Sequence, residues 1–284
     1  GTLFPLLGEA LDIKISVRSP YFNAFFVPLT LVLMMLLVPG MSSNWKKQDG
    51  RVLLTRLFWL VPVSIVLGVA LVVVSGGELP FVAVLAVVLV VYVVLAHIID
   101  WLQKARAFRS GLFAGARRLP RAYYGMLLGH IGLAIIVAGV TQVSFRESER
   151  DLRMVAGDVA NVAGYEFTFA EVVDRAGANF NAVRGIVPVT RDGQLLTTLH
   201  PEKRTYLASG QVMTEASIHS NLWRDIYVAL GEPIDDTAWA VRIYYKPGIG
   251  WLWIGSLLLG IGGFLAASDR RYRSRKAENS DVVA

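Results

Sequence analysis

The chain has 284 residues, of which 54% are hydrophobic and only 18% are charged, whereas an average soluble domain is about 25% charged. With a mean hydropathy of +0.50, it is neither a disordered chain nor an ordinary soluble enzyme. There is no cysteine, which excludes disulfides, thiolate metal sites, thiol nucleophiles and cysteine-held iron–sulfur clusters. The sequence begins at Gly1 rather than methionine, and we expect it to be an internal piece of a longer protein.

Five apolar segments are long enough to cross a bilayer, which takes about 20 residues. They contain no Asp, Glu, Lys or Arg and lie at about 22–41, 57–75, 80–99, 122–142 and 248–268. The third is nearly pure Val, Leu and Ala. A lone strand in lipid would leave its backbone unpaired, so a helix is expected there. The predicted fold class is a membrane all-α bundle of five transmembrane helices with one inserted external all-β domain.

Basic residues set the predicted orientation of these helices. They concentrate in the 42–56 loop, the 100–121 loop and the 269–284 tail, whereas acidic residues outnumber basic ones in 143–247. Because Lys and Arg mark cytoplasmic segments, we expect residues 1–21 to be an external lead-in, 143–247 an external domain and 269–284 a cytoplasmic basic tail. Topology accounts for the net charge of +6, so no nucleic-acid partner is expected.

Residues 143–247 show the pattern of a β domain. Short runs rich in β-branched and aromatic residues are bounded by turn residues at 165–173, 182–189, 195–200, 225–230 and 239–245. Asp192-Gly193 is typical of a tight hairpin, because both residues accept positive φ angles. The sequence is consistent with a small barrel or a sandwich and does not distinguish them.

His130 is the ionisable residue that lies deepest in a predicted span. At 1.5 Å per residue it is ~13 Å from Arg121, near mid-membrane depth, where ionisable side chains are costly and usually have a partner. A neutral imidazole is a good iron ligand, and haem tolerates an apolar pocket. The alternative is an interhelical hydrogen bond to Thr or Tyr, worth on the order of 1 kcal/mol. Position alone favours neither interpretation.

Glycines divide the same helix into two faces. Helical spacing places Gly125, Gly129, Gly132 and Gly139 on a face that we expect to contact a neighbouring helix, and His130 on another face. The glycines in 260–263 lie inside an apolar span and predict helix packing rather than dinucleotide binding, because no strand precedes them.

The other histidines are predicted to have ordinary roles. His97 lies near the end of its span, and we expect it to reach interfacial water. His200 precedes Pro201 and suggests a surface turn, and His219 suggests a solvated polar residue. No Walker A motif and no triad spacing occur.

Several separated stretches carry a resemblance to a known family. They lie at 1–5, 16–23, 129–130, 213–216, 224–232, 239–247 and 262–273. The first two resemble the middle of CcmF, the integral-membrane haem-lyase subunit of bacterial cytochrome c maturation, and the last four resemble its C-terminal part. Gly129-His130 is similar to a transmembrane histidine element of that family.

The resemblance implies a function and a location. CcmF-like proteins receive haem from a haem chaperone on the periplasmic side and join it to the two cysteines of an apocytochrome c. They also hold a separate haem b between two transmembrane histidines, of which His130 matches one. The implied site is therefore His130 as an axial ligand of haem b iron, in the inner membrane, with the β domain in the periplasm.

The resemblance also implies what is missing. The second axial ligand, and the external histidines beside a Trp-rich segment, belong to an N-terminal part that this sequence lacks, so the fragment is not expected to be an active enzyme alone. The implied partners are that missing part, the haem chaperone, apocytochrome c, thiol-handling maturation subunits and the lipid bilayer. Two alternatives remain, a haem transporter component and a non-catalytic membrane scaffold that recruits assembly partners.

Overall fold

The computed structural model describes residues 19–43, 50–76, 80–108 and 111–269. It divides into two compact units. One combines the described residues up to Ala134 with those from Leu257 onward, and the other comprises residues 135–256. Most of the predicted 1–21 lead-in and almost all of the predicted 269–284 tail lie outside the described residues.

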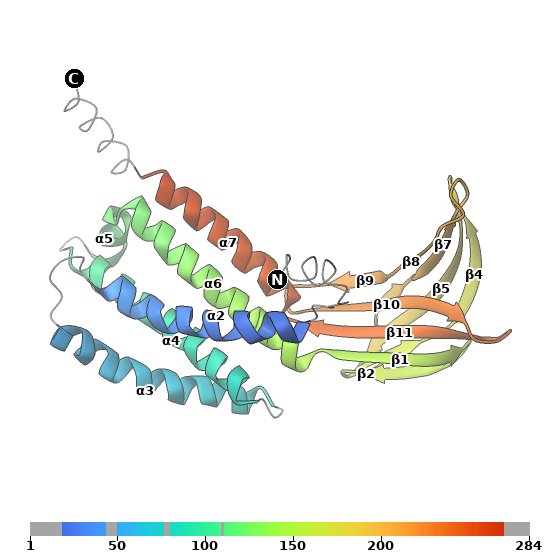
Figure 1. Cartoon of the computed structure of the whole chain (residues 1–284), viewed down its shortest axis with the longest axis horizontal. Coiled ribbons are helices and arrows are strands. Elements are labelled where there is room, and N and C mark those ends of the chain that lie inside the picture. Colours follow the sequence, from blue (N-terminus) through green and yellow to red (C-terminus); the bar gives the residue numbers. More distant parts are fainter. Residues whose placement is uncertain (1–18, 44–49, 77–79, 109–110, 270–284) are drawn as a thin grey trace, which may run out of the picture. The chain divides into compact units, whose positions relative to one another are not determined.

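The helices are drawn in Figure 1. They are α2 (Ser19–Ser42), α3 (Gly50–Val74), α4 (Phe81–Arg106), α5 (Leu112–Arg118), α6 (Arg121–Arg146) and α7 (Ile249–Ala267). Four of them, α2, α4, α6 and α7, are long and apolar enough to cross a membrane, and each overlaps one predicted window. The described apolar run of α3, Phe58–Val74, is shorter. A multi-pass membrane protein is therefore supported, while five spans are not confirmed.

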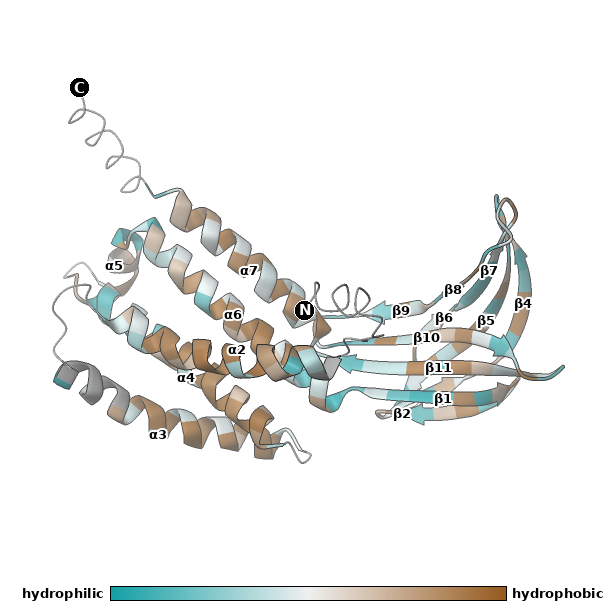
Figure 2. Ribbon diagram, viewed as in Figure 1, coloured by the Kyte–Doolittle hydropathy of each residue, from teal (hydrophilic) through white to brown (hydrophobic). Residues whose placement is uncertain are grey.

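Hydrophobic residues predominate along the long helices, as the brown colour in Figure 2 shows. Large side chains such as Phe26 (65% exposed), Leu29 (67%) and Val74 (84%) are mostly exposed among the described residues. An exposed apolar surface of this extent is suited to lipid. The valine-rich segment of α4 is helical, because a helix satisfies every backbone group within the segment.

Within the first unit, α6 packs closely against α7. A Cβ on Gly125 would lie 2.6 Å from both the Ala266 nitrogen and the Gly262 oxygen, so only glycine permits this approach. The prediction that the glycine face contacts a neighbouring helix is confirmed at this position. Of the glycines in 260–263, Gly262 makes the contact, whereas a Cβ on Gly260 or Gly263 would meet nothing within 4 Å.

The second unit holds the β domain. Its strands are β1 (Ser148–Val155), β2 (Val159–Val162), β3 (Tyr165–Thr168), β4 (Glu171–Ala176), β5 (Phe180–Arg191), β6 (Gln194–Leu199), β7 (Glu202–Tyr206), β8 (Val212–Glu215), β9 (Ser217–Ser220), β10 (Arg224–Pro233) and β11 (Ala238–Pro247). One sheet has the order β1-β11-β10-β9. The other has the order β2-β3-β5-β7-β8, and the long strand β5 also pairs with β4 and β6.

Both sheets contribute to one apolar core. Phe167 and Val189 from the larger sheet, and Ile226, Val228 and Ile243 from the smaller one, are fully buried in the same cluster. Buried and partly exposed residues alternate along β10, as they do in a strand with one face in a core. Two sheets around a shared core make this domain a sandwich, which resolves the choice that the sequence left open.

One strand prediction is wrong. Segment 165–173 forms two strands, β3 and β4, rather than one. The break falls at Phe169, which is 1% exposed and donates its backbone N–H to the Asp158 carbonyl, while Ala170 donates to Ile186. The chain changes hydrogen-bonding partner at this point, and burial of the Phe169 ring stabilises the corner.

The hairpin prediction is confirmed. Arg191 pairs with Gln194 across the turn, and Asp192 and Gly193 have φ angles of 52° and 74°. These are the positive angles that a tight hairpin turn of this type requires.

Candidate functional site

His130 lies in the first unit, near the middle of α6, and contacts α4. Its Nδ1 lies 2.8 Å from Nε2 of His97. The two rings meet edge to face, with their centroids 4.9 Å apart and their planes at 88°. His130 and Gly125 lie on different faces of α6, so the histidine contacts α4 while the glycine contacts α7.

His97 is the histidine that sequence reasoning misjudged. It was expected to reach interfacial water, but it is 1% exposed and its Nδ1 donates to the Val93 carbonyl at 2.7 Å. The error arose because the predicted window ended at residue 99, whereas α4 continues to Arg106. His97 therefore lies well inside the helix, on the face turned to α6.

The alternative of an interhelical hydrogen bond is thus realised, with a different partner from those expected. The bond joins His130 to another imidazole and not to Thr or Tyr. Two imidazoles in an apolar span are most stable when both are neutral, because charge is costly there. Each neutral ring then has one N–H donor and one acceptor nitrogen.

The remaining ring nitrogen of His130, Nε2, is accessible. Within the part of the chain that the structure describes, Nε2 has no hydrogen-bond partner. That region also holds no buried side-chain nitrogen or oxygen without a partner, so Nε2 is not enclosed. It also contains no cluster of three or more His, Cys, Asp or Glu side chains suited to a metal ion. The site therefore has one imidazole nitrogen, Nε2 of His130, that is free to bind a metal ion, and the other nitrogen of that ring is hydrogen-bonded to His97.

A second polar contact joins the same two helices nearer their charged ends. The Tyr123 hydroxyl donates to Asp100 Oδ2 at 2.9 Å, and Lys104 donates to the same oxygen at 2.7 Å. Asp100 and Lys104 are spaced i, i+4, which was the available sequence signal. Together with the histidine pair, this contact fixes the register of α4 against α6.

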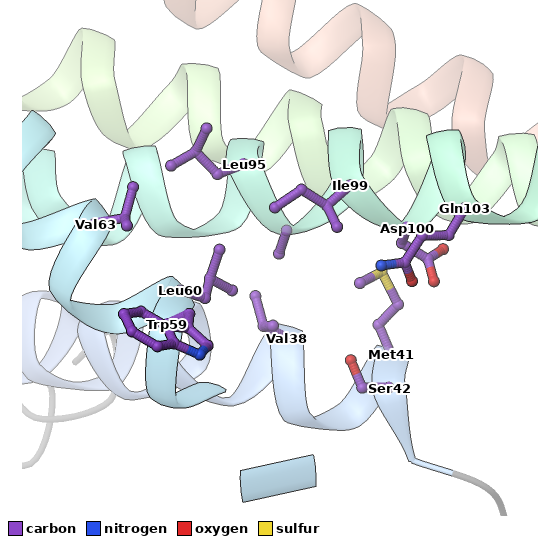
Figure 3. A pocket seen from close by; sticks show the side chains of 11 residues that line it. Val38, Met41, Ser42, Trp59, Leu60, Val63, Leu95, Ile99, Asp100 and Gln103 are labelled. Carbon is purple, nitrogen blue, oxygen red and sulfur yellow. The ribbon is translucent and has the colours of Figure 1, made fainter. Parts of the chain in front are cut away.

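An apolar cavity of about 320 Å³ lies among α2, α3 and α4. Figure 3 shows Val38, Trp59 and Leu60 on one side and Ile99 on the other, with Asp100 and Gln103 at one end. No histidine is among its lining residues, so this cavity is separate from the histidine pair and supplies no imidazole ligand.

The two histidines of the β domain have different surroundings. His200 is exposed in the short link between β6 and β7, which confirms the predicted surface position. His219 is not freely solvated. Its Nδ1 accepts a hydrogen bond from Arg224 Nη1 at 2.8 Å. Arg224 is 5% exposed and also donates to the Tyr165 hydroxyl at 3.0 Å, so His219 is part of a structural polar contact.

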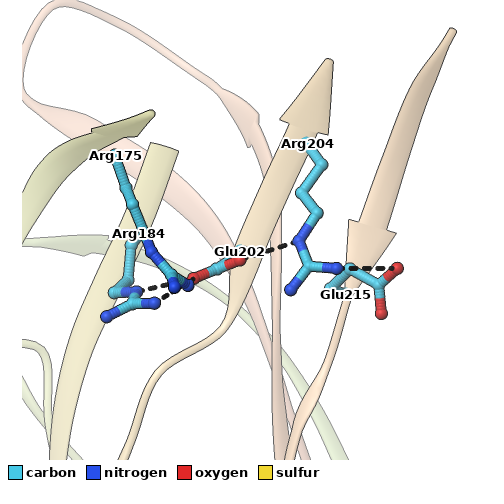
Figure 4. Close-up of polar contacts among 5 residues, drawn as sticks. All are labelled: Arg175, Arg184, Glu202, Arg204 and Glu215. Atoms are coloured by element: carbon cyan, nitrogen blue, oxygen red, sulfur yellow. Dashed lines mark hydrogen bonds and ion pairs between the residues drawn. The ribbon is translucent and has the colours of Figure 1, made fainter. Parts of the chain in front are cut away.

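Arginines converge on one buried carboxylate in the same domain (Figure 4). Glu202 is 3% exposed. Its oxygens lie 2.7 Å from Arg175 and 2.8 Å from Arg204, and Arg184 lies 2.5 Å away. Burial by itself would raise the pKa of Glu202, but the hydrogen bonds from the arginines outweigh it and hold the pKa at about 2. The carboxylate is therefore charged and paired at neutral pH.

Comparison with known proteins links this arrangement to a family. Residues 145–247 match the family model described as the CcmF C-terminal beta-sandwich. The chain is 46% identical over 279 residues to the cytochrome c-type biogenesis protein CcmF of Pseudomonas aeruginosa. It is 34% identical over 276 residues to the protein of that name from Escherichia coli.

The chain is CcmF-like. These alignments cover 96% and 97% of the chain but 41% of each relative, so the chain spans about two fifths of the length of the curated relatives that it matches. A solved structure named cytochrome c heme lyase CcmF is similar to this chain, with a TM-score of 0.74 and 20% sequence identity. The match covers 94% of this chain and 42% of the chain in that structure. At that identity the match supports the fold of the CcmF-like chain.

Proposed function

We propose that this chain is the C-terminal portion of a membrane haem-lyase subunit for cytochrome c maturation, in which His130 supplies one axial ligand to a haem b. The observation that carries the proposal is the open Nε2 of His130 in an apolar span, backed by His97. The similarity to CcmF proteins supplies the biological setting.

The donor set fits one side of a haem. A neutral imidazole with an accessible lone pair is a usual axial ligand of haem iron. His97 does not qualify as the second ligand, because both of its nitrogens take part in hydrogen bonds. The second ligand therefore comes from the part of CcmF proteins that this chain does not span.

The residues of this chain position and insulate the ligand. α6 sets the depth of His130, and the close approach of Gly125 to α7 holds α6 in place. The apolar residues of the span would keep water away from the ligand within the bilayer. A haem held by His130 and by a second histidine outside this chain would supply electron transfer.

We assign to the β domain a docking role on the periplasmic side of the inner membrane. In the second unit, Trp223 packs edge-on against Trp251 of α7 at 5.8 Å, and the Gly248 N–H donates to the Trp223 carbonyl at 2.8 Å. Leu222 and Trp223 are 47% and 64% exposed. Exposed aromatic side chains beside the start of a span suit the membrane interface, which supports a domain that presents its sandwich to partners next to the bilayer.

Loss of haem on substitution of His130 tests the proposal. The chain is produced together with the remaining part of a CcmF protein, and haem is measured by absorption spectroscopy and pyridine haemochrome content. We expect a six-coordinate haem b in the wild type. We expect the His130→Gly protein to lose at least about 90% of its bound haem, because removing an axial ligand removes a coordinate bond to the iron. Added imidazole should restore part of the haem spectrum.

His200→Gly is the matched control, since it removes an exposed histidine from the β domain and should leave the haem unchanged. Wild-type haem content in the His130→Gly protein would contradict the ligand role. The scaffold interpretation would then be favoured. Haem uptake into sealed vesicles that contain the chain would favour the transporter.

A further inference from the structure

The direction of the hydrogen bonds at the histidine pair is fixed by one carbonyl group. The Val93 oxygen can only accept, so Nδ1 of His97 must carry the proton of that 2.7 Å bond. A carbonyl has two lone pairs, and this oxygen can accept from the ring as well as from the helix backbone. In a neutral His97, Nε2 is then the acceptor nitrogen.

The tautomer of His130 follows from that of His97. Since Nε2 of His97 accepts, Nδ1 of His130 donates across the 2.8 Å contact. Nε2 of His130 is therefore unprotonated, with its lone pair available. The opposite assignment would place the acceptor Nδ1 of His97 against the Val93 oxygen, so that two lone pairs would face each other.

We infer that His97 is a positioning residue for the haem ligand. Its Nε2 accepts a hydrogen bond from the Nδ1–H of His130 and thereby orients the unprotonated Nε2 of His130 for iron. This inference rests on the proposed function, in which His130 binds haem. A second hydrogen-bonded group behind a ligating histidine fixes its ring and raises its basicity, and loss of such a group typically costs 10–100-fold in metal affinity. A more basic ligand favours ferric over ferrous iron and so lowers the reduction potential.

Two amide substitutions test the roles of the two His97 nitrogens separately. In His97→Asn the amide lies where Nδ1 was and can still donate to Val93, but it does not reach His130. In His97→Gln the amide oxygen lies where Nε2 was and can accept from His130. The proteins are the same co-produced complexes, and the measurements are haem affinity and the reduction potential of the bound haem.

We expect His97→Asn to lose 10–100-fold in haem affinity and to have a more positive reduction potential. His97→Gln should remain close to the wild type in both. Tyr92→Phe is the control on α4, because it alters a buried aromatic residue that is not a hydrogen-bond partner of either imidazole, and it should change neither quantity.

The inference is overturned if His97→Asn matches the wild type, or if Asn and Gln shift both quantities equally. If His97→Asn does not accumulate, the ferric wild-type haem is measured by electron paramagnetic resonance. Its signal should be displaced from that of two neutral imidazoles towards imidazolate character, and an undisplaced signal would contradict the role of His97. These outcomes leave the ligand role of His130 standing, whereas normal haem in His130→Gly removes both.

Discussion

Three arginine side chains converge on the carboxylate of Glu202. The pKa of the Glu202 carboxyl is about 4.5 in the unfolded chain and about 2 in the folded one. The charged carboxylate therefore stabilises the fold fully above pH 4.5, and this stabilisation is lost as the pH falls towards 2. The shift corresponds to about 3 kcal/mol at neutral pH. Removing the charge also leaves the arginines without their common partner.

We expect Glu202→Gln to destabilise the chain by about 3 kcal/mol at pH 7, measured as denaturant unfolding followed by tryptophan fluorescence in detergent. The difference from the wild type should narrow as the pH falls from about 4.5 towards 2. Glu215→Gln is the control, because Glu215 is 41% exposed and lies 3.6 Å from Arg204, so it should cost less than about 1 kcal/mol. Equal losses in the two variants would refute the role of Glu202.

At this scale, sequence reasoning singled out a residue that stood alone, and its role as a haem ligand stays a prediction. His130 is ionisable inside an apolar run, and that fact alone marked it. His97 was not recognised, because the predicted span ended at residue 99, whereas α4 continues through Asp100 and Lys104 to Arg106. The convergence on Glu202 depends on the pairing of β5 with β4 and β7, which a local pattern does not encode.

The contact between α6 and α7 depends on the absence of side chains. A Cβ on Gly125 would lie 2.6 Å from backbone atoms of α7, and backbone cannot move aside as a flexible side chain does. We therefore expect Gly125→Ala to cost about 1–3 kcal/mol in thermal or denaturant unfolding in detergent, and to reduce haem occupancy through displacement of α6.

Gly263→Ala is the matched control on α7. A Cβ at that position meets nothing within 4 Å, and alanine has the higher helix propensity, so its effect should be neutral or slightly stabilising. Destabilisation of similar size in both variants would show that the close approach of the helices is not the cause.

Elements were predictable where their pattern is strong. The long apolar helices and the strands around 182–189, 225–230 and 239–245 were found from composition and turn residues. The strands β1, β2, β7, β8 and β9 were not predicted. Half of the residues of β1 (SERDLRMV) are charged, and Met154, its single buried residue, gives no alternating pattern. Its structure comes from pairing with β11, which is a tertiary effect.

The whole chain gives one decisive test of membrane orientation, because it contains no cysteine. Single cysteines can be introduced at Ala114 in α5 and at Ala208 in the β domain, both of which are exposed. Of the helices in Figure 1, only α6 lies between these positions in the sequence. The comparison therefore concerns one crossing and does not depend on whether α3 spans the membrane.

We expect Ala208→Cys to be labelled by a membrane-impermeant maleimide in intact spheroplasts. Ala114→Cys should be labelled only after the membrane is opened. The physical reason is the basic loop around α5, including Arg117 and Arg118, which the positive-inside rule assigns to the cytoplasm. The cysteine-free parent chain measures background labelling. The reverse pattern would place the sandwich in the cytoplasm, on the wrong side for docking an apocytochrome, and equal labelling would mean that α6 does not cross the bilayer.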